Sequence, residues 1–156
     1  GQHVATRSGL LDAITRSSRF RKEEDGARDK AVELLDFVGL GSKMNELSRN
    51  LPYGEQKRLE IARALAAEPR LILLDEPTAG LNPREKAAVS DLIRAVHERG
   101  ITVILIEHDM RVVMGISQRI VVLDHGERIA AGTPDEVKAD ARVIEAYLGK
   151  QPAVKS

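Results

Sequence analysis

Titratable side chains follow two short apolar segments of this chain, and they are the side chains best suited to chemistry. Asp75 and Glu76 come directly after the apolar run 71–74, and His108 lies just beyond a second run at 101–106. Mg²⁺ prefers carboxylate oxygen, and phosphoryl transfer to water needs a residue that orients the nucleophile. Neighbouring residues at a strand end point in different directions, so the two acids could divide these roles. Taken alone, an acidic pair in such a place more often belongs to an ordinary turn, and a single histidine is more often an ordinary surface or core residue.

Apolar runs and amphipathic stretches alternate from residue 54 onward, which predicts an α/β fold with a mostly parallel sheet. The runs at 71–74 and 101–106 are typical of strands buried on both faces. Ligands of such sheets gather at the carboxyl ends of the strands, where the titratable residues stand. The remaining elements expected are helices at 54–67, 83–99 and 109–115, strands at 120–123 and 128–131 joined by a turn at 124–127, and a helix from residue 134.

The two ends of the chain read as helical. Residues 1–50 are expected to be all-helical, and a helix over 25–38 should end at Gly39. Near the other end, Thr133 suits an N-cap with Glu136 completing a capping box. The positions expected on the core faces of the first two helices are Ala27, Ala31, Leu34, Leu35 and Val38, followed by Leu59, Ala62 and Ala66.

Composition describes an ordinary globular chain and excludes several classes of site. Of the 156 residues, 42% are hydrophobic and 31% charged, and the 24 basic residues equal the 24 acidic ones. Net charge therefore gives no reason to expect nucleic-acid binding. The absence of cysteine excludes disulfides and thiolate metal sites. The longest apolar run has six residues, at 101–106, far short of the roughly 20 that span a bilayer.

The string from Leu71 to Thr78 resembles the Walker B motif of ABC ATPases. The resemblance implies that Asp75 binds Mg²⁺ and that Glu76 is the catalytic glutamate. His108 stands where this family has its switch histidine, which contacts the γ-phosphate of ATP. The D-loop of the family, which crosses a dimer interface, is matched by Gly80, Leu81 and Asn82, although its usual last residue is aspartate.

A second motif lies upstream and resembles the ABC signature, which in the family meets the ATP held by the opposite subunit. Pro52 replaces the usual serine and Tyr53 replaces a glycine, so a hydroxyl contact is lost. Gly54 is retained, and a glycine-bearing turn that opens a helix still offers N–H groups to phosphate. The residues matched to the signature are Leu51, Pro52, Tyr53, Gly54 and Glu55.

The chain resembles in particular the ATP-binding subunits of branched-chain amino acid uptake systems, to which the segments 132–137 and 146–149 are similar. The fold implied is part of a P-loop NTPase of the ABC type, a helical subdomain followed by a mostly parallel sheet with flanking helices. The divisions expected are a partial helical subdomain at 1–50, a core with the signature, Walker B, D-loop and switch histidine at 51–131, and a C-terminal helical tail at 132–156.

No string of the P-loop form G-x-x-x-x-G-K-[ST] occurs in the 156 residues. In the family the P-loop and the glutamine loop precede the helical subdomain, and the chain starts at Gly1, so we expect a fragment. The P-loop supplies most of the phosphate grip. We therefore expect this chain alone to bind ATP poorly and one face of its sheet to be uncovered.

The resemblance implies an ATP- and Mg²⁺-dependent hydrolase that powers amino acid import. Its partners would be a second ABC ATPase subunit, identical or paralogous, the membrane permease subunits and, indirectly, a substrate-binding protein, with no nucleic acid. It would lie peripherally on the cytoplasmic face of the inner membrane. Two alternatives are an ABC ATPase outside transport and a non-catalytic fragment that serves dimerisation or docking.

Overall fold

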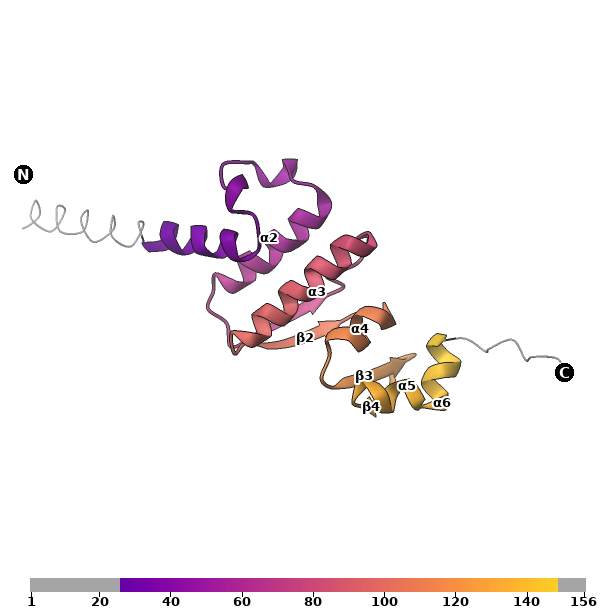
Figure 1. The fold of residues 1–156 in the computed structure, drawn as a ribbon. Helices are drawn as coiled ribbons and strands as arrows, with labels where there is room; N and C mark the ends of the chain where they lie inside the picture. The colour runs from indigo at the N-terminus through magenta and orange to yellow at the C-terminus, as the bar shows by residue number, and fades with distance from the viewer. Residues whose placement is uncertain (1–25, 149–156) are drawn as a thin grey trace, which may run out of the picture. The chain divides into compact units, whose positions relative to one another are not determined.

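The computed structural model describes residues 26–148, and these fall into two compact units that divide between Pro69 and Arg70. The predicted helix start at residue 25 and the tail beyond Leu148 lie outside the described residues. The elements of each unit can be followed in Figure 1, and the units are considered one at a time.

The first unit is helical but is not one continuous set of helices. Residues 26–37 form a helix that ends where Gly39 adopts a φ of +72° and its N–H bonds to the Asp36 carbonyl at 2.9 Å. A left-handed residue of this kind stops a helix, and glycine adopts it without steric cost. The prediction of an all-helical segment to residue 50 is wrong, because loops and two short 3₁₀ turns follow. These are η1 (Gly41–Lys43) and η2 (Ser48–Asn50), and they lead into helix α2 (Tyr53–Leu65).

Only some of the positions that the periodicity predicted for the core of the first unit are buried, namely Leu34, Val38 and Ala62. Ala27, Ala31 and Ala66 are exposed, contrary to expectation. Among the described residues, burial of the helix at 26–37 is confined to Leu34 near its C-terminal end, and Ala27 and Ala31 stay accessible. In α2, Ala62 is buried as predicted and Leu59 is half-buried, whereas Ile61 and Leu65, which were not predicted, are buried as well. The fully buried apolar side chains are Leu34, Val38, Leu40, Leu51, Ile61, Ala62 and Leu65.

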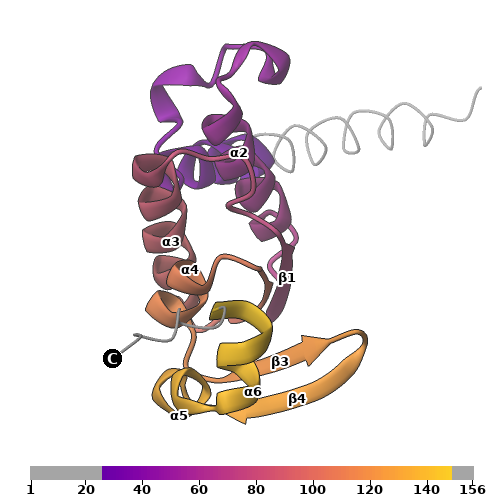
Figure 2. The same ribbon diagram turned by 90° about the vertical axis from the view of Figure 1, so that its right-hand side faces the viewer.

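The second unit contains the predicted parallel pair of strands, β1 (Leu71–Asp75) and β2 (Thr102–Ile106). Helix α3 (Pro83–Glu98) connects them (Figures 1 and 2). Helix α3 buries an apolar stripe of Val89, Leu92, Ile93 and Val96.

The strands are not buried on both faces as predicted. Leu71, Leu73, Ile104 and Ile106 alternate along β1 and β2, and each is 48–59% exposed. Among residues 26–148, helix α3 covers only the opposite face, which carries the buried Ile72. The exposed apolar face agrees with the expectation that one side of the sheet is uncovered.

A compact hairpin and short helices complete the second unit. Helix α4 (Met110–Ile116) leads to β3 (Ile120–Asp124) and β4 (Glu127–Gly132), which pair antiparallel. The turn between them has φ of +48° at His125 and +83° at Gly126, as a two-residue hairpin turn of the primed type requires. The capping box at Thr133 is confirmed, and it opens α5 (Pro134–Ala139), which is followed by α6 (Ala141–Val143) and η3 (Ile144–Leu148). Ile120, Val122, Ala130, Val137 and Val143 form the buried cluster beneath these elements.

Candidate functional site

The carboxyl ends of β1 and β2 lie side by side and bring the titratable residues together. The parallel register pairs Asp75 with Ile106, so the residues that follow each strand meet at one edge. The Glu76 N–H donates to the Ile106 carbonyl at 2.9 Å and continues the ladder one residue beyond the strand. Sequence segments some 30 residues apart are thereby joined at the position predicted for chemistry.

Glu76 and His108 are in contact at this edge. The Glu76 carboxylate oxygen Oε1 lies 3.1 Å from His108 Nδ1. Both side chains remain accessible, with 52% of Glu76 and 68% of His108 exposed. Glu76 has a φ of +44°, a left-handed conformation that is costly for a residue with a side chain. Strain of this sort is often retained at functional positions, where it aims a side chain in a particular direction.

Asp75 ends β1 as an exposed carboxylate next to this pair. Within residues 26–148 no group of three or more His, Cys, Asp or Glu side chains is arranged to hold a metal ion. A single carboxylate still suits Mg²⁺ in a nucleotide site, because that ion keeps several waters and takes other oxygens from the phosphates. Asp75 therefore fits as one ligand of a shared metal site.

Glu107 is a buried carboxylate at the same edge, and sequence reasoning assigned it no role. Only 1% of its side chain is exposed. Its Oε1 accepts hydrogen bonds from the N–H and the hydroxyl of Thr78, and its Oε2 accepts from the N–H groups of His108 at 3.1 Å and Asp109 at 3.4 Å. Burial alone would raise the pKa of Glu107, but these hydrogen bonds outweigh burial and hold the pKa below its usual value.

The segment predicted as the D-loop leads directly into α3. Leu81 is buried, and Gly80 has a φ of +73°. Asn82 is the N-cap of α3: its Oδ1 accepts from the Glu85 N–H, and the Glu85 carboxylate accepts from the Asn82 N–H, each at 3.0 Å. The sequence did carry a signal for this second capping box, since Asn, Pro at the next position and Glu at the third match the pattern.

One turn into α3, an ion pair links this helix to the segment that carries His108. Lys86 Nζ lies 2.7 Å from Asp109 Oδ2, and 15% of the Asp109 side chain is exposed. The hydrogen bond from Lys86 is the main cause that holds the pKa of Asp109 below its usual value. Asp109 Oδ1 also accepts from the Arg111 N–H and caps α4.

The residues matched to the signature lie in the first unit, at the start of α2. Pro52 is the N-cap and makes no side-chain hydrogen bond there, while Tyr53 is 51% exposed with Lys57 Nζ 5.6 Å from its ring centre. Gly54 is buried, and its neighbour Glu55 bonds Lys43 at 2.7 Å. Leu51 is buried, and its carbonyl accepts from the Gln56 side chain at 2.8 Å.

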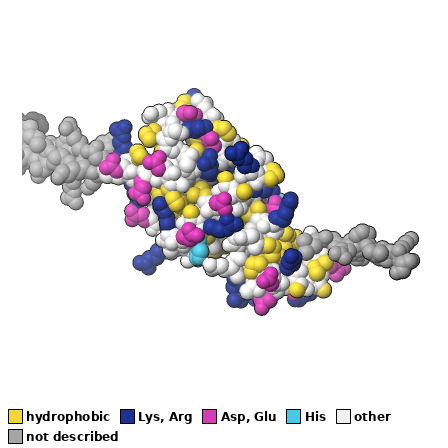
Figure 3. All heavy atoms as spheres, in the orientation of Figure 1, with side chains coloured by type: hydrophobic (Ala, Val, Ile, Leu, Met, Phe, Trp, Pro, Cys, Tyr) yellow, Lys and Arg dark blue, Asp and Glu magenta, His cyan; other side chains and the backbone are white. Residues whose placement is uncertain are grey.

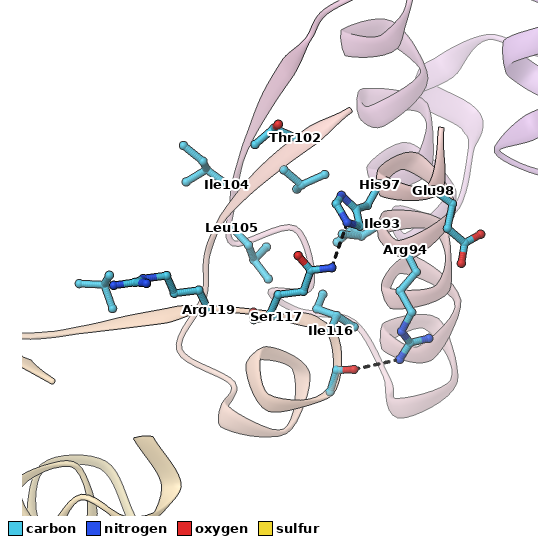
Figure 4. A pocket seen from close by; sticks show the side chains of 14 residues that line it. Ile93, Arg94, His97, Glu98, Thr102, Ile104, Leu105, Ile116, Ser117 and Arg119 are labelled. Carbon is cyan, nitrogen blue, oxygen red and sulfur yellow. Dashed lines mark hydrogen bonds between the residues drawn. The ribbon is translucent and has the colours of Figure 1, made fainter. Parts of the chain in front are cut away.

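A pocket in the second unit lies apart from these residues. It has a volume of about 720 Å³ and is lined by side chains of α3, β2, the segment 115–119 and Val121 (Figure 4). His97 and Gln118 are hydrogen-bonded at 3.1 Å within it. Asp75, Glu76 and His108 are not among its lining residues, so the strand-end site is an exposed edge instead of this pocket.

The surface shown in Figure 3 intersperses acidic and basic side chains, in keeping with the balanced composition. Over residues 26–148, none of the helices has the length and apolar character needed to cross a bilayer.

Comparison with known sequences gives two family matches. Residues 3–79 match the ABC transporter family, and residues 127–153 match the family of branched-chain amino acid ATP-binding cassette transporters. The first match contains the signature and Walker B segments, and the second contains the C-terminal tail. The two matches together support the resemblance found from the motifs.

Curated relatives cover nearly the whole chain. The high-affinity branched-chain amino acid transport ATP-binding protein LivG of Salmonella typhimurium is 43% identical over 150 residues, which is 96% of this chain and 59% of the relative. LivG of Escherichia coli K12 is 42% identical over the same coverage. The lipopolysaccharide export system ATP-binding protein LptB of Haemophilus influenzae is 39% identical over 124 residues, covering 80% of this chain and 52% of the relative. The chain thus spans about three-fifths of the length of its LivG relatives.

Solved structures give the same result for the fold. The ADP conformation of MJ1267, an ATP-binding cassette of an ABC transporter, matches with a TM-score of 0.74 and 30% identity over 80% of this chain and 51% of that one. The cbiO1 protein of Clostridium perfringens matches with a TM-score of 0.70 and 33% identity over 78% of this chain and 49% of that one. The α/β fold of the ABC ATPase type is therefore confirmed.

Proposed function

The chain belongs to the ATP-binding proteins of the ABC transporter family, and from this membership we propose that it is part of a subunit that hydrolyses ATP to power the import of branched-chain amino acids. The observation that carries the proposal is the contact between Glu76 and His108 at the ends of β1 and β2. A carboxylate next to an imidazole at the carboxyl edge of a parallel sheet is suited to bind and orient the water and phosphate of such a reaction.

Each residue at this edge has one role in the proposal. Glu76 orients the attacking water and accepts its proton, and its accessibility leaves room for that water. His108 contacts the γ-phosphate and stabilises the charge that develops on it. Asp75 would hold Mg²⁺, which supplies positive charge to the phosphates when bound.

The proposal places the complete ATP site between two subunits. The signature residues from Leu51 to Glu55 would contact ATP bound by a second ABC subunit, with Gly54 and its neighbours offering backbone N–H groups at the start of α2. The D-loop from Gly80 to Asn82 would lie at the same interface. Permease subunits, and through them a substrate-binding protein, would be further partners, so the protein would act on the cytoplasmic face of the inner membrane.

The substrate class is supported by the C-terminal match. LptB, a lipopolysaccharide export protein, aligns with 80% of the chain, whereas the LivG proteins align with 96%. The match of residues 127–153 to the branched-chain amino acid transporter family favours amino acid import over export of lipid. An ABC ATPase outside transport and a non-catalytic docking fragment remain the alternatives for the test to decide.

A chimera tests the proposal directly. In it, this chain replaces the matching 150 residues of E. coli LivG, and both ATP turnover and the uptake of leucine by cells lacking LivG are measured. We expect both activities to be restored, and Glu76→Gln to reduce turnover by about 10²- to 10⁴-fold, the usual value of a general base. Glu98→Gln, at an exposed glutamate near the end of α3, is the matched control and should keep full turnover.

The pattern of losses separates the alternatives. Turnover without uptake would favour an ATPase of another system. A chimera that assembles with its partners but does not hydrolyse ATP would favour the docking fragment and overturn the proposal.

A further inference from the structure

We propose that Glu107 is a positioning residue that clamps the loop after β1 to the loop after β2 and so holds Glu76 and His108 in register. This inference rests on the proposed function and adds to it a residue that does not itself contact the nucleotide. The juxtaposition that carries it is one buried carboxylate with hydrogen-bond donors from both strand ends.

One oxygen of the carboxylate serves each loop. Oε1 binds the N–H of Thr78 at 3.0 Å together with its hydroxyl, two residues beyond Glu76. Oε2 binds the N–H of His108 at 3.1 Å and that of Asp109 at 3.4 Å. The single side chain of Glu107 therefore joins Thr78 to His108 and Asp109, which lie about 30 positions later in the sequence.

The buried setting makes these hydrogen bonds strong. Thr78 is fully buried and only 1% of the Glu107 side chain is exposed, so water cannot replace a lost partner. Hydrogen bonds to an ionised carboxylate are about twice as strong as neutral ones. A polar group that is left unpaired in such a place loses its hydrogen bond with no compensating bond to water.

The clamp acts on the backbone immediately beside each reactive side chain. Thr78 lies within the turn in which the Ala79 N–H donates to the Glu76 carbonyl at 3.1 Å, and this turn holds the left-handed conformation of Glu76. On the other side, the bond to His108 N fixes the backbone from which the imidazole reaches Glu76. Movement of either loop would separate the two side chains, and a displacement of about 1 Å at a reacting centre can cost about 10²-fold in rate.

A glutamine at position 107 cannot accept all the hydrogen bonds that the Glu107 carboxylate accepts. In Glu107→Gln one of the two accepting oxygens becomes an NH₂ group, which would face N–H or O–H donors on one side. The variant keeps the size of the side chain, removes its negative charge and replaces one acceptor by a donor. We therefore expect Glu107→Gln to open one loop while the rest of the second unit keeps its packing.

Hydrogen exchange of the 156-residue chain tests the clamp without any assumption about activity. We expect the amides of Thr78, His108 and Asp109 to be protected, and exchange at one or both loops to rise by at least about tenfold in Glu107→Gln. The matched control is Glu136→Gln, which alters a carboxylate that also accepts a backbone N–H, from Thr133 at 2.8 Å, but lies in the capping box of α5, away from the clamp. That control should leave exchange at the three amides unchanged.

Steady-state kinetics of the LivG chimera test the consequence. Glu107→Gln should lower kcat by about 10- to 10²-fold while KM changes by less than about threefold, because the altered loops orient groups that act in the transition state. Thr78→Val should lower kcat less, since it removes only the hydroxyl donor, and Thr78→Ser should restore it. A purely structural role would instead reduce the amount of folded protein and leave kcat per folded molecule constant.

The outcomes are distinguishable from failure of the proposed function. A hydrolysing chimera whose kcat is unaffected by Glu107→Gln would overturn the clamp and leave the proposed function standing. An inactive chimera would overturn the proposed function, and hydrogen exchange would then test the clamp by itself. Equal exchange of the loop amides in wild type and Glu107→Gln would overturn the clamp. If Glu107→Gln fails to fold, Thr78→Val decides, and unchanged exchange at residue 78 would refute the proposal.

Discussion

Glu107 and His108 are adjacent residues after β2, and they differ in burial and in contacts. His108 is exposed and free to meet a ligand, whereas Glu107 is buried and fully engaged with the backbone. The hydrogen bonds from Thr78, His108 and Asp109 hold the Glu107 carboxylate inward, whereas the His108 imidazole reaches only the exposed Glu76 carboxylate. The site thus combines an accessible reactive pair with a buried support beneath it.

The ionisation of Glu107 makes a prediction about acid stability. Hydrogen bonds to the charged form hold its pKa below the usual value, so its stabilisation is complete above about pH 4.5, the range in which unfolded glutamates are ionised, and is lost as pH falls through the native pKa. At pH 7 we expect Glu107→Gln to lower the free energy of unfolding by about 1–3 kcal/mol. Urea unfolding followed from pH 7 to pH 3 should show this difference shrinking below about pH 4.5. A difference that stays constant across the range would contradict the assignment.

Helix α3 connects the segments that carry chemistry. Its first residue follows Asn82 of the D-loop, and its Lys86 is paired with Asp109 beside His108. The departure from the usual aspartate at Asn82 leaves this start intact, because asparagine and aspartate are equally good N-caps.

Removal of the cap gives a prediction for this element. Asn82→Ala should lower the free energy of unfolding by about 0.5–2 kcal/mol, because the Glu85 N–H loses its acceptor. Asn82→Asp should stay within about 0.5 kcal/mol of wild type, or gain slightly from the positive end of the helix dipole. Urea denaturation of the three proteins measures both effects. Equal stability of wild type and Asn82→Ala would show that α3 does not depend on this cap.

At the scale of the whole molecule, the strand-end residues belong to one unit and the signature residues to the other. Each unit has its own buried core, and the candidate site residues Asp75, Glu76 and His108 all lie in the second unit. The half-exposed apolar face of β1 and β2 is the largest departure from an ordinary buried sheet. Exposed apolar surface of this kind commonly marks a place of contact with other protein.

The missing phosphate-binding string sets the expected activity of the chain by itself. Without a P-loop among its 156 residues, the chain should bind ATP weakly and hydrolyse it negligibly, because Asp75 offers a single carboxylate for Mg²⁺. Nucleotide binding by fluorescence and phosphate release should be compared between the chain and the LivG chimera. Turnover by the chain alone that disappears in Glu76→Gln would contradict this expectation.

The sequence by itself was sufficient for the order and type of most elements from α2 to α5. Patterns that depend on near neighbours, such as the apolar run of β1, the capping box at Thr133 and the stripe of α3, survive in the structure because they use local contacts. The candidate site residues were likewise found from motifs: Asp75 ends β1, Glu76 follows it, and His108 lies two residues beyond the end of β2. Their assigned roles stay predictions.

Only the tertiary structure decided which side chains support the site and which faces are covered. Glu107 follows β2 as any acid could, and its role depends on Thr78, which lies 29 residues earlier and reaches it only because β1 and β2 pair in register. The exposure of Leu73 and Ile104 likewise depends on what packs against the sheet, which an apolar run does not specify. Local sequence selects the elements, whereas burial and hydrogen bonding between distant residues are fixed by how those elements pack.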